Sequence, residues 1–542
     1  MLPRTHVLAL RLLLCASAGP ALAADSRHAA GAALFLTTCA PCHQPTGEGV
    51  RGIFPPLAKS DYLMADKDRS IRIALQGTAG PMTVNGIEYQ GVMPAPGPLD
   101  DQQVADVLTY VRSSWGNAGG AVTASEVKRV RAELAAADPD KTDPFAPLPK
   151  PPEGFKLREI VRLPVHGVKL ATMPGADWIM VLNNSGEIYR LEPATGNLVR
   201  LLVPKDYAEL GAGSLAVLGM TIDSKKRLYV VTNQRVAEQP WHINRVVIFR
   251  SEPLDTAGSP PKLTAWLRTS YPWGNSYYNH GVCHIAEGPD GFMYVSSGAR
   301  TDGGEVDGGI FKKETVYWKG GETDYTAAIW RIDPIAEVPK IEIFAQGIRN
   351  AWTFAWNDRG DLFSVSNGPD AHRPEEMDHV EKGKHYGFPY QYADFPATDK
   401  PYPYTPDVPP GLIITPAIRN FGPAAGGSET KPIASFDAHS SPAGMLFCND
   451  DWPASLRGKM LIGRFGNFLL DDSYGYDILA ADLKRNAAGV YEARMTTFFA
   501  PLARPIDFLK VGKKLFILEY TRPVGKHGSR PMNPGRVLEL SW

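Results

Sequence analysis

Five consecutive residues, Cys39-Ala40-Pro41-Cys42-His43, bring two thiols and an imidazole together in one short run. A C-x-x-C-H run is the attachment signature of c-type haem, in which the thiols form thioether bonds and the histidine reaches the iron. A zinc site would need two more cysteine or histidine ligands nearby, and residues 44–115 contain none. A redox dithiol would need a thioredoxin-like βαβ context, which is missing here. We therefore expect one covalent haem c, held by Cys39 and Cys42, with His43 as an axial ligand.

A second axial ligand is needed if the haem only transfers electrons, and a thioether raises its reduction potential. Three methionines follow the haem motif, and Met93 stands in Gly-Val-Met-Pro-Ala, directly before a proline. A methionine in a proline-flanked loop is positioned rather than merely packed, so Met93 is the predicted ligand. Met82 is the alternative, and Met64 and Met82 also suit core packing.

Two predicted helices frame this motif. Residues 29–37 have helical apolar spacing, and Asp100 or Asp101 could cap a helix running to about Trp115. Residues 33–117 then resemble a class I cytochrome c domain of the kind found in bacterial quinoprotein dehydrogenase complexes. The matching segments are Cys-Ala-Pro-Cys-His-Gln-Pro-Thr-Gly-Glu-Gly-Val, Phe-Pro-Pro-Leu-Ala, Gly-Val-Met-Pro-Ala and Val-Leu-Thr-Tyr-Val-Arg-Ser-Ser-Trp-Gly-Asn. The resemblance implies that Pro55-Pro56 lies beside His43.

The chain has 542 residues, which favours several domains, and a formal net charge of −1, which gives no basic field for nucleic acid. Residues 1–24 have the pattern of a cleaved signal peptide, with an apolar run and Ala21-Leu22-Ala23 as the cleavage site. The apolar run is too short to span a bilayer stably. We expect an exported, periplasmic protein with no transmembrane segment and a cytochrome domain over 25–120.

Two cysteines are left once the haem motif and Cys15 of the signal are set aside. Cys283 and Cys448 could pair in an oxidising compartment, or both could be buried thiols, and the sequence leaves both readings open.

Residues 121–155 are predicted to form a linker. An exposed helix over 121–137 precedes a segment with prolines at 144, 147, 149, 151 and 152, which favours a semi-rigid extended spacer.

From residue 156 onward a different pattern repeats: an apolar strand, a polar turn with Gly or Asp, and another apolar strand. Six such units begin at Trp178, Met220, Ile285, Phe354, Met445 and Ile506. About 64 residues per unit leaves room for four strands, which is typical of a six-bladed β-propeller over 156–542. A large β-sandwich is the alternative, and the Pro- and Gly-rich residues 390–435 are expected to be a loop insertion. The predicted fold class is therefore multidomain, an all-α cytochrome domain followed by an all-β propeller.

Three segments carry residues suited to chemistry at a propeller mouth. They are Tyr278-Asn279-His280, Gly347-Ile348-Arg349-Asn350 and Ser366-Asn367-Gly368-Pro369-Asp370. In this order they resemble the soluble glucose dehydrogenase and sorbosone dehydrogenase family, whose members are propellers that use pyrroloquinoline quinone (PQQ) and calcium. The resemblance covers about 160–540 and is strongest in the middle blades.

The resemblance assigns roles to individual residues. His280 matches the catalytic base, Arg349 and Asn350 match a pair beside the quinone, and Gly368 and Pro369 match the backbone carbonyls that bind calcium. Arg504 matches a cofactor-binding arginine, and Arg464 lies near the position of a family lysine. The chemistry agrees, because guanidinium groups suit a tricarboxylate, carbonyl oxygens suit Ca²⁺, and histidine suits proton abstraction. Glu375 and Glu376 could be ligands or a solvated loop.

Three positions depart from the family pattern. Ala299 replaces an acidic residue of glucose-oxidising members, and Asp302, at a different spacing, is the candidate to orient His280 instead. Trp352 stands where those members have an amide, and Arg464 aligns ambiguously. These departures leave open the substrate and, less strongly, the cofactor.

The resulting expectation is a periplasmic quinohaemoprotein dehydrogenase. It would oxidise a sugar, sugar aldehyde or alcohol at PQQ and pass electrons through haem c to an external cytochrome or respiratory acceptor. One alternative is an electron-transfer or binding protein whose propeller no longer binds PQQ. Another is an eight-bladed quinoprotein alcohol dehydrogenase, which the missing tryptophan-docking repeats and vicinal Cys-Cys disfavour.

Overall fold

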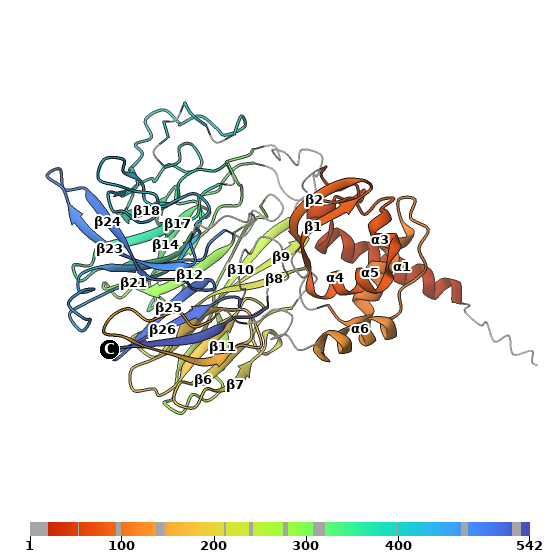
Figure 1. Cartoon of the computed structure of the whole chain (residues 1–542), viewed down its shortest axis with the longest axis horizontal. Helices are drawn as coiled ribbons and strands as arrows, with labels where there is room; N and C mark the ends of the chain where they lie inside the picture. Colours follow the sequence, from red (N-terminus) through yellow and green to blue (C-terminus); the bar gives the residue numbers. More distant parts are fainter. Residues whose placement is uncertain are drawn as a thin grey trace, which may run out of the picture.

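The computed structural model defines an N-terminal helical domain and a large β-structure that follows it (Figure 1). The residues described are 20–51, 54–93, 99–136, 145, 147–210, 213–237, 242–274, 280–306, 320–369, 371–393, 395–396, 398–400, 402–467, 475–522 and 533–542. Most of the predicted signal, residues 1–19, lies outside them, as do Tyr278, Asn279 and Asp370.

The N-terminal domain consists of six helices and one hairpin among the described residues. They are α1 Pro20–Thr38, α2 Ala40–His43, α3 Asp61–Ala65, α4 Lys67–Gln76, β1 Thr78–Val84, β2 Ile87–Met93, α5 Asp101–Ser113 and α6 Ala124–Ala136. Helices α1 and α5 cross in close contact at Gly31, where a Cβ atom would lie 2.2 Å from the carbonyl oxygen of Asp106. Phe35, Tyr110 and Trp115 pack beside this crossing and form the core around the haem motif.

The start of α5 agrees with the sequence prediction. Asp100 is the N-cap, its side chain accepts a hydrogen bond from the backbone N–H of Gln103, and the Gln103 side chain accepts one from the N–H of Asp100. This reciprocal capping box satisfies two backbone donors that a helix start leaves free. The helix ends at Ser113, two residues before the predicted end.

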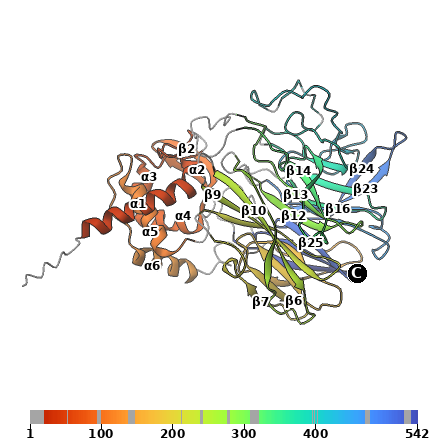
Figure 2. The same ribbon diagram turned by 180° about the vertical axis from the view of Figure 1, so that it is seen from behind.

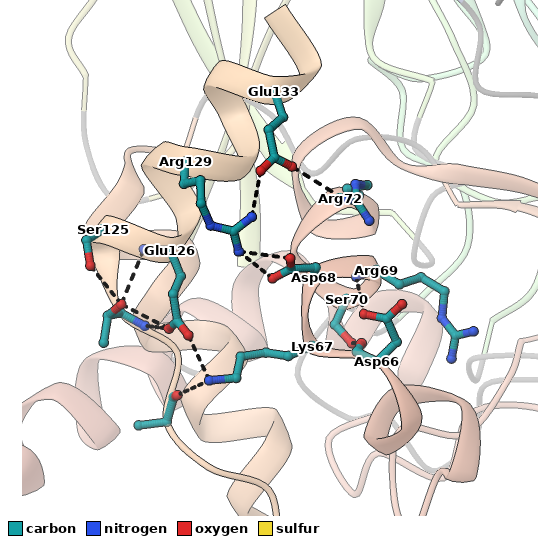
Figure 3. A network of polar contacts seen from close by, with 12 residues as sticks. Asp66, Lys67, Asp68, Arg69, Ser70, Arg72, Ser125, Glu126, Arg129 and Glu133 are labelled. Carbon is teal, nitrogen blue, oxygen red and sulfur yellow. Dashed lines mark hydrogen bonds and ion pairs between the residues drawn. The ribbon is translucent and has the colours of Figure 1, made fainter. Parts of the chain in front are cut away.

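Helix α6 corrects the expectation of an exposed linker helix. Val127 and Val130 are fully buried against Ile71, Val104 and Leu108 of α4 and α5. Charged residues surround this apolar contact: Lys67 pairs with Glu126 at 2.9 Å, and Arg129 bridges Asp68 and Glu133 at 2.7 and 2.6 Å (Figure 3). Exposed pairs are worth roughly 0–1 kcal/mol each, so the buried valines do most of the docking. Helix α6 therefore belongs to the helical domain.

The C-terminal domain is a six-bladed propeller among the described residues, as the repeat predicted. Its strands follow in chain order. They are β3 Lys156–Arg162, β4 Gly167–Ala171, β5 Ile179–Asn183, β6 Ile188–Glu192, β7 Asn197–Leu202, β8 Leu215–Ile222, β9 Arg227–Ala237, β10 His242–Pro253, β11 Leu263–Pro272, β12 Val282–Glu287, β13 Met293–Ser297, β14 Ala328–Ile332, β15 Glu342–Gln346, β16 Ala351–Trp356, β17 Leu362–Ser366, β18 Glu376–Val380, β19 Arg419–Asn420, β20 Ile433–Ala434, β21 Pro442–Phe447, β22 Met460–Arg464, β23 Asp477–Arg485, β24 Tyr491–Phe499, β25 Pro505–Val511, β26 Lys514–Glu519 and β27 Arg536–Ser541, with a short 3₁₀ turn η1 at Pro204–Asp206.

Each blade is a separate sheet, and its strands pair antiparallel except for β19 and β24, which are parallel. Blades 1 to 3 are β4–β7, β8–β11 and β12–β15, blade 4 is β16–β18, and blade 5 is β21–β24, extended by β19 and β20. Five of the six predicted units are the innermost hairpins of their blades, whereas the unit starting at Trp178 is β5–β6. The expected insertion at 390–435 holds only β19 and β20 as strands in its described part.

Blade 6 closes the ring with a strand from the other end of the domain. Strand β3 pairs antiparallel with β27, so this sheet has the order β25-β26-β27-β3. Arg536 strengthens the seam by donating to Glu159, 377 positions away, at 3.0 Å. This closure was not predicted from the sequence.

The innermost strands β4, β8, β12, β16, β21 and β25 contact one another in a closed ring. We call the end of the propeller at which these strands begin the mouth end. The helical domain lies at one end of the long axis of the molecule, and β9 and β10 are among the propeller strands drawn nearest to it in both views (Figures 1 and 2). Among the described residues, no helix has the length and apolar character needed to cross a membrane.

Candidate functional site

The haem motif is built around a buried histidine. His43 ends the short helix α2, and its Nδ1 lies 2.9 Å from the carbonyl oxygen of Pro55. A carbonyl only accepts, so Nδ1 carries the proton and Nε2 keeps the lone pair that an iron ligand needs. Burial lowers the pKa of His43, which keeps the imidazole neutral. Cys39 lies one helical turn before His43, Cys42 directly precedes it, and neither cysteine forms a disulfide. The donor set therefore fits haem c, and the expected position of Pro55 is confirmed.

The predicted methionine ligand lies on a hairpin rather than in a loop. Met93 is the last residue of β2 and pairs with Thr78, whereas Met82 in β1 pairs with Tyr89. These pairs share one face of the hairpin, because side chains alternate along a strand. Buried Val84 and Tyr89 lie on that same face, so it is the inner one, and both methionines are half-buried. The hairpin thus presents two thioethers inward, and Met93 stays a prediction.

At the mouth end, Arg349 is the centre of a buried polar cluster. It lies just before β16 and is 2% exposed. Its guanidinium donates to the Asp302 carboxylate at 2.5 Å, to the Asp302 carbonyl at 3.0 Å and to the Gly368 carbonyl at 2.6 Å. Asp302 also accepts a hydrogen bond from Tyr402. Asp302 therefore holds Arg349, which argues against the expectation that it orients His280.

His280 and Asn350 lie beside this cluster with polar atoms that have no partner among the described residues. They flank Gly298, where an added Cβ would lie 2.6 Å from the His280 Cβ and 3.2 Å from Asn350 Oδ1. His280 Nε2 and Asn350 Oδ1 are both buried and unpaired within the described part of the chain. Burial, and then the charge of Arg349, holds the pKa of His280 well below its usual value. The imidazole is thus neutral at physiological pH and able to accept a proton.

The two other predicted arginines have different surroundings. Arg504, just before β25, donates to the carbonyls of Phe465, Gly466 and Asn467, and its guanidinium lies 4.8 Å from the Phe465 ring centroid. Arg464, at the end of β22, pairs bidentately with Asp477 at 2.7 and 2.8 Å and also contacts Asp437. Arg504 is therefore bound to neutral oxygens, whereas the Arg464 charge is already compensated.

The predicted calcium ligands, Gly368 and Pro369, follow β17 at the same end. The Gly368 carbonyl accepts from Arg349, so a cation there would share its oxygen with a guanidinium. No group of three or more metal-ligating His, Cys, Asp or Glu side chains occurs in the described part of the chain. The carbonyls have the right chemistry for Ca²⁺, but the cationic neighbour makes the fit incomplete.

Buried carboxylates lie behind Gly368. Glu375 accepts from the Ser440 hydroxyl at 3.0 Å and the Ser441 N–H at 2.5 Å, and burial raises its pKa to about 8. Asp378 is fully buried, neither of its oxygens has a hydrogen-bond partner among the described residues, and burial raises its pKa to about 8. Both Glu375 and Glu376 are buried, so the solvated-loop interpretation is wrong.

Three residues at the mouth end were not identified as functional from the sequence. His166, just before β4, stacks on Tyr520 at 4.7 Å between ring centroids, and Asn184 lies 3.4 Å from the Tyr520 hydroxyl. Position alone could have identified His166, because His280, Asn350 and Arg504 also lie one or two positions before innermost strands.

The two remaining cysteines are free and buried. Cys283 lies in β12 of blade 3, and Cys448 follows β21 of blade 5. The disulfide that the sequence left open is therefore not formed.

A haem-binding helical domain joined to a six-bladed propeller defines an oxidoreductase with its own electron-transfer domain. The cytochrome c profile matches residues 28–115, and the glucose/sorbosone dehydrogenase profile matches residues 166–470. The chain belongs to the glucose/sorbosone dehydrogenase family, and it carries a cytochrome c domain.

Relatives of the cytochrome part are found among curated proteins. Cytochrome c-552 of Thermus thermophilus is 38% identical over 113 residues, covering 19% of this chain and 86% of that protein. The cytochrome c subunit of alcohol dehydrogenase (quinone) from Gluconobacter oxydans is 38% identical over 106 residues, covering 19% of this chain and 22% of that protein.

Solved structures of propellers share less sequence identity with this chain. The PQQ-bound aldose sugar dehydrogenase of Streptomyces coelicolor has 18% identity and a TM-score of 0.44, covering 72% of this chain and 99% of that one. The apo-form soluble aldose sugar dehydrogenase of Escherichia coli has 15% identity and a TM-score of 0.46, covering 71% and 99%.

Proposed function

We propose that this protein is a periplasmic quinohaemoprotein dehydrogenase. It oxidises a sugar, sugar aldehyde or alcohol at PQQ bound at the mouth end and delivers the electrons through its own haem c to an external cytochrome or respiratory acceptor. The matching family is named for glucose and sorbosone dehydrogenases, which supports dehydrogenation as the reaction class. The signal-like residues 1–24 support export.

The observation that carries the proposal is the set of unpaired polar atoms beside Arg349. Buried polar groups in folded proteins nearly always have hydrogen-bond partners, and leaving one unpaired costs roughly 1–3 kcal/mol. His280 Nε2 and Asn350 Oδ1 have none among the described residues. A polar ligand at the mouth end would supply them, and the guanidinium groups of Arg349 and Arg504 suit a ligand that is an anion.

The residues of this chain have distinct roles in such a reaction. Bound PQQ supplies a two-electron acceptor for the hydride that leaves the substrate carbon. His280, neutral because its pKa is lowered, takes the proton of the substrate hydroxyl at Nε2. Asp302 and the Gly368 carbonyl fix the Arg349 guanidinium in one orientation, so it is in place before a ligand binds. Arg464 is less suited to the cofactor than predicted, because Asp477 and Asp437 already bind it.

The linker supports electron transfer within one chain. Phe145 lies among three guanidinium groups, with its ring centroid 4.4 Å from Arg162, 4.6 Å from Arg522 and 5.5 Å from Arg536. These arginines lie at the end of β3, after β26 and at the start of β27, which is the mouth end of blade 6. Eight residues, 137–144, lie between the end of α6 and Phe145, and the chain from Ala136 to Phe145 spans at most about 32 Å. The haem domain is thereby confined near the mouth end, which raises the effective concentration of the acceptor.

The proposal is tested with the purified, haem-loaded chain. PQQ and Ca²⁺ are added, and haem reduction is followed optically while aldoses, sugar aldehydes and alcohols are supplied in turn. We expect at least one class to reduce the haem, and His280→Gln to lose this activity while keeping the haem spectrum. No haem reduction with any substrate class would overturn the proposal.

Trp352 favours a second candidate, an electron carrier or binding protein that lacks quinone. Its half-buried ring packs against a core cluster that includes the strands of blade 1. In the glucose-oxidising members that this chain resembles, a polar amide stands at the position of Trp352. Calorimetric titration with PQQ separates the two candidates, because heat of binding supports the dehydrogenase and its complete absence supports the carrier.

A further inference from the structure

Lys169 reaches across the axis of the propeller. It lies in β4 of blade 1, its side chain is 1% exposed, and its Nζ is 5.4 Å from the centroid of the Trp352 ring in blade 4. Blades 1 and 4 are opposite each other in the six-membered ring, so their side chains can meet only across the axis. Its ammonium group therefore lies near the centre of the propeller.

This layer lies directly beneath the mouth-end residues. Lys169 is three positions after His166, Trp352 is two after Asn350, and Asp507 is three after Arg504. A strand rises about 3.3 Å per residue, so the layer is roughly 7–10 Å below the level at which the innermost strands begin. Lys169, Trp352 and Asp507 thus form the floor under the proposed cofactor site.

The floor has more hydrogen-bond donors than acceptors among the described residues. An ammonium group has three donors, but Lys169 Nζ has no hydrogen-bond partner in the described part of the chain. Its nearest carboxylate oxygen, Asp507 Oδ1, is 3.5 Å away, and Asp507 Oδ2 already accepts from the Leu170 N–H at 2.7 Å. Trp352 Nε1 is a second buried donor without an acceptor there.

Such an arrangement is unfavourable in the free protein. Burying an ammonium costs several kcal/mol unless ion pairing and hydrogen bonds satisfy it. The ion pair at 3.5 Å, which has no hydrogen bond, and the cation–π contact with Trp352 do so only partly. An anionic or carbonyl oxygen at the floor would supply the hydrogen-bond acceptor that Lys169 Nζ and Trp352 Nε1 lack among the described residues. The floor is therefore built to receive an oxygen of a ligand that enters from the mouth end.

We propose that Lys169 binds an anionic oxygen of the planar carboxylated quinone at the mouth end. This inference rests on the proposed function and adds to it a third cation, from blade 1. Arg349, Arg504 and Lys169 then contact the ligand from three different blades.

The test compares binding and stability in the haem-loaded chain. Lys169→Met with Asp507→Asn removes both charges together, so neither partner is left as an isolated buried charge. The matched control is Lys510→Met, which removes a lysine near the other end of β25 that pairs with the exposed Asp451 at 3.2 Å. Calorimetry measures the affinity for PQQ and for benzene-1,3,5-tricarboxylate, a planar anion that cannot be reduced, and thermal unfolding is followed without ligand.

We expect the double variant to bind PQQ at least 10-fold more weakly while its unfolding temperature is unchanged or higher, and the control to bind as the natural chain does. Equal affinity with a lowered unfolding temperature would assign the pair a purely structural role and overturn the inference. If the natural chain binds the tricarboxylate through Lys169 but not PQQ, the anion site stands and the proposed function fails. If it binds neither, both fail.

Discussion

Asp302 and Arg349 form a buried ion pair at the mouth end, with 2.5 Å between Oδ1 and Nη2 and exposed side-chain fractions of 3% and 2%. The pair joins the loop after β13 to the start of β16, two segments from different blades. Because the ion pair fixes its orientation, the Arg349 guanidinium is already in position for a carboxylate ligand. The stability of this buried guanidinium in turn depends on the charge of Asp302.

Asp302→Asn is expected to lower the free energy of unfolding by about 3–5 kcal/mol, because Arg349 would be buried without its counter-charge. Denaturant unfolding measures the change. The double variant Asp302→Asn with Arg349→Met should lose less than the single one, since no charge is left behind. A loss below about 1 kcal/mol in the single variant would contradict a tightly coupled pair.

Dehydrogenase activity should persist below pH 6.5. His280 must be neutral to take a proton, and a lowered pKa keeps it neutral to lower pH than an ordinary histidine. The pH profile of haem reduction in the PQQ-loaded protein is the measurement, with the acid limb expected well under 6.5. An acid limb at 7 or above would assign the proton transfer to another group.

Asp378→Asn should stabilise the protein at pH 8–9 and have little effect below about pH 4. The folded-state pKa of Asp378 is raised from 3.8 to about 8, so its contribution to stability is fully present below the unfolded pKa, falls as pH rises from about 4 to 8 and is constant above that. Asparagine has no charge to bury. Unfolding temperatures of both proteins across pH are compared with a chelator present, and a variant that is destabilised at pH 9 under these conditions would contradict the prediction.

The two inward methionines of the hairpin are distinguished by spectroscopy. Met93→Ala should abolish the near-infrared band of a methionine–iron bond in the oxidised protein and lower the reduction potential. Met82→Ala, from the same face of the hairpin, is the matched control and should keep both. The opposite result would assign the iron ligand to Met82.

Phe145→Ala should slow electron transfer from the propeller to the haem, by several-fold, because it frees the linker from the arginines of blade 6. Leu148→Ala, at a linker side chain that is 45% exposed, is the control and should not change the rate. Stopped-flow haem reduction gives the rate, and small-angle scattering shows whether the two domains separate more widely. Equal rates for both variants would mean that the linker anchor is not needed.

Local patterns in the sequence were sufficient for much of the fold. The Cys39–His43 run, the Asp100 cap and the repeated hairpins each lie within a few residues, so their chemistry can be read directly. Strand β3 could not be assigned to blade 6, because its partner β27 is nearly the whole domain away in the chain. Lys169 lies in Gly-Val-Lys-Leu-Ala, which resembles any strand with an outward lysine, and only the ring of blades turns it toward the axis.

The seam between β3 and β27 has a consequence for how the chain is made. Strand β27 is synthesised after every other strand of the propeller, so β3 has no partner until then, while every residue of the haem domain already exists. The haem domain can therefore fold while the propeller is still an open ring, and the pairing of β27 with β3 closes that ring.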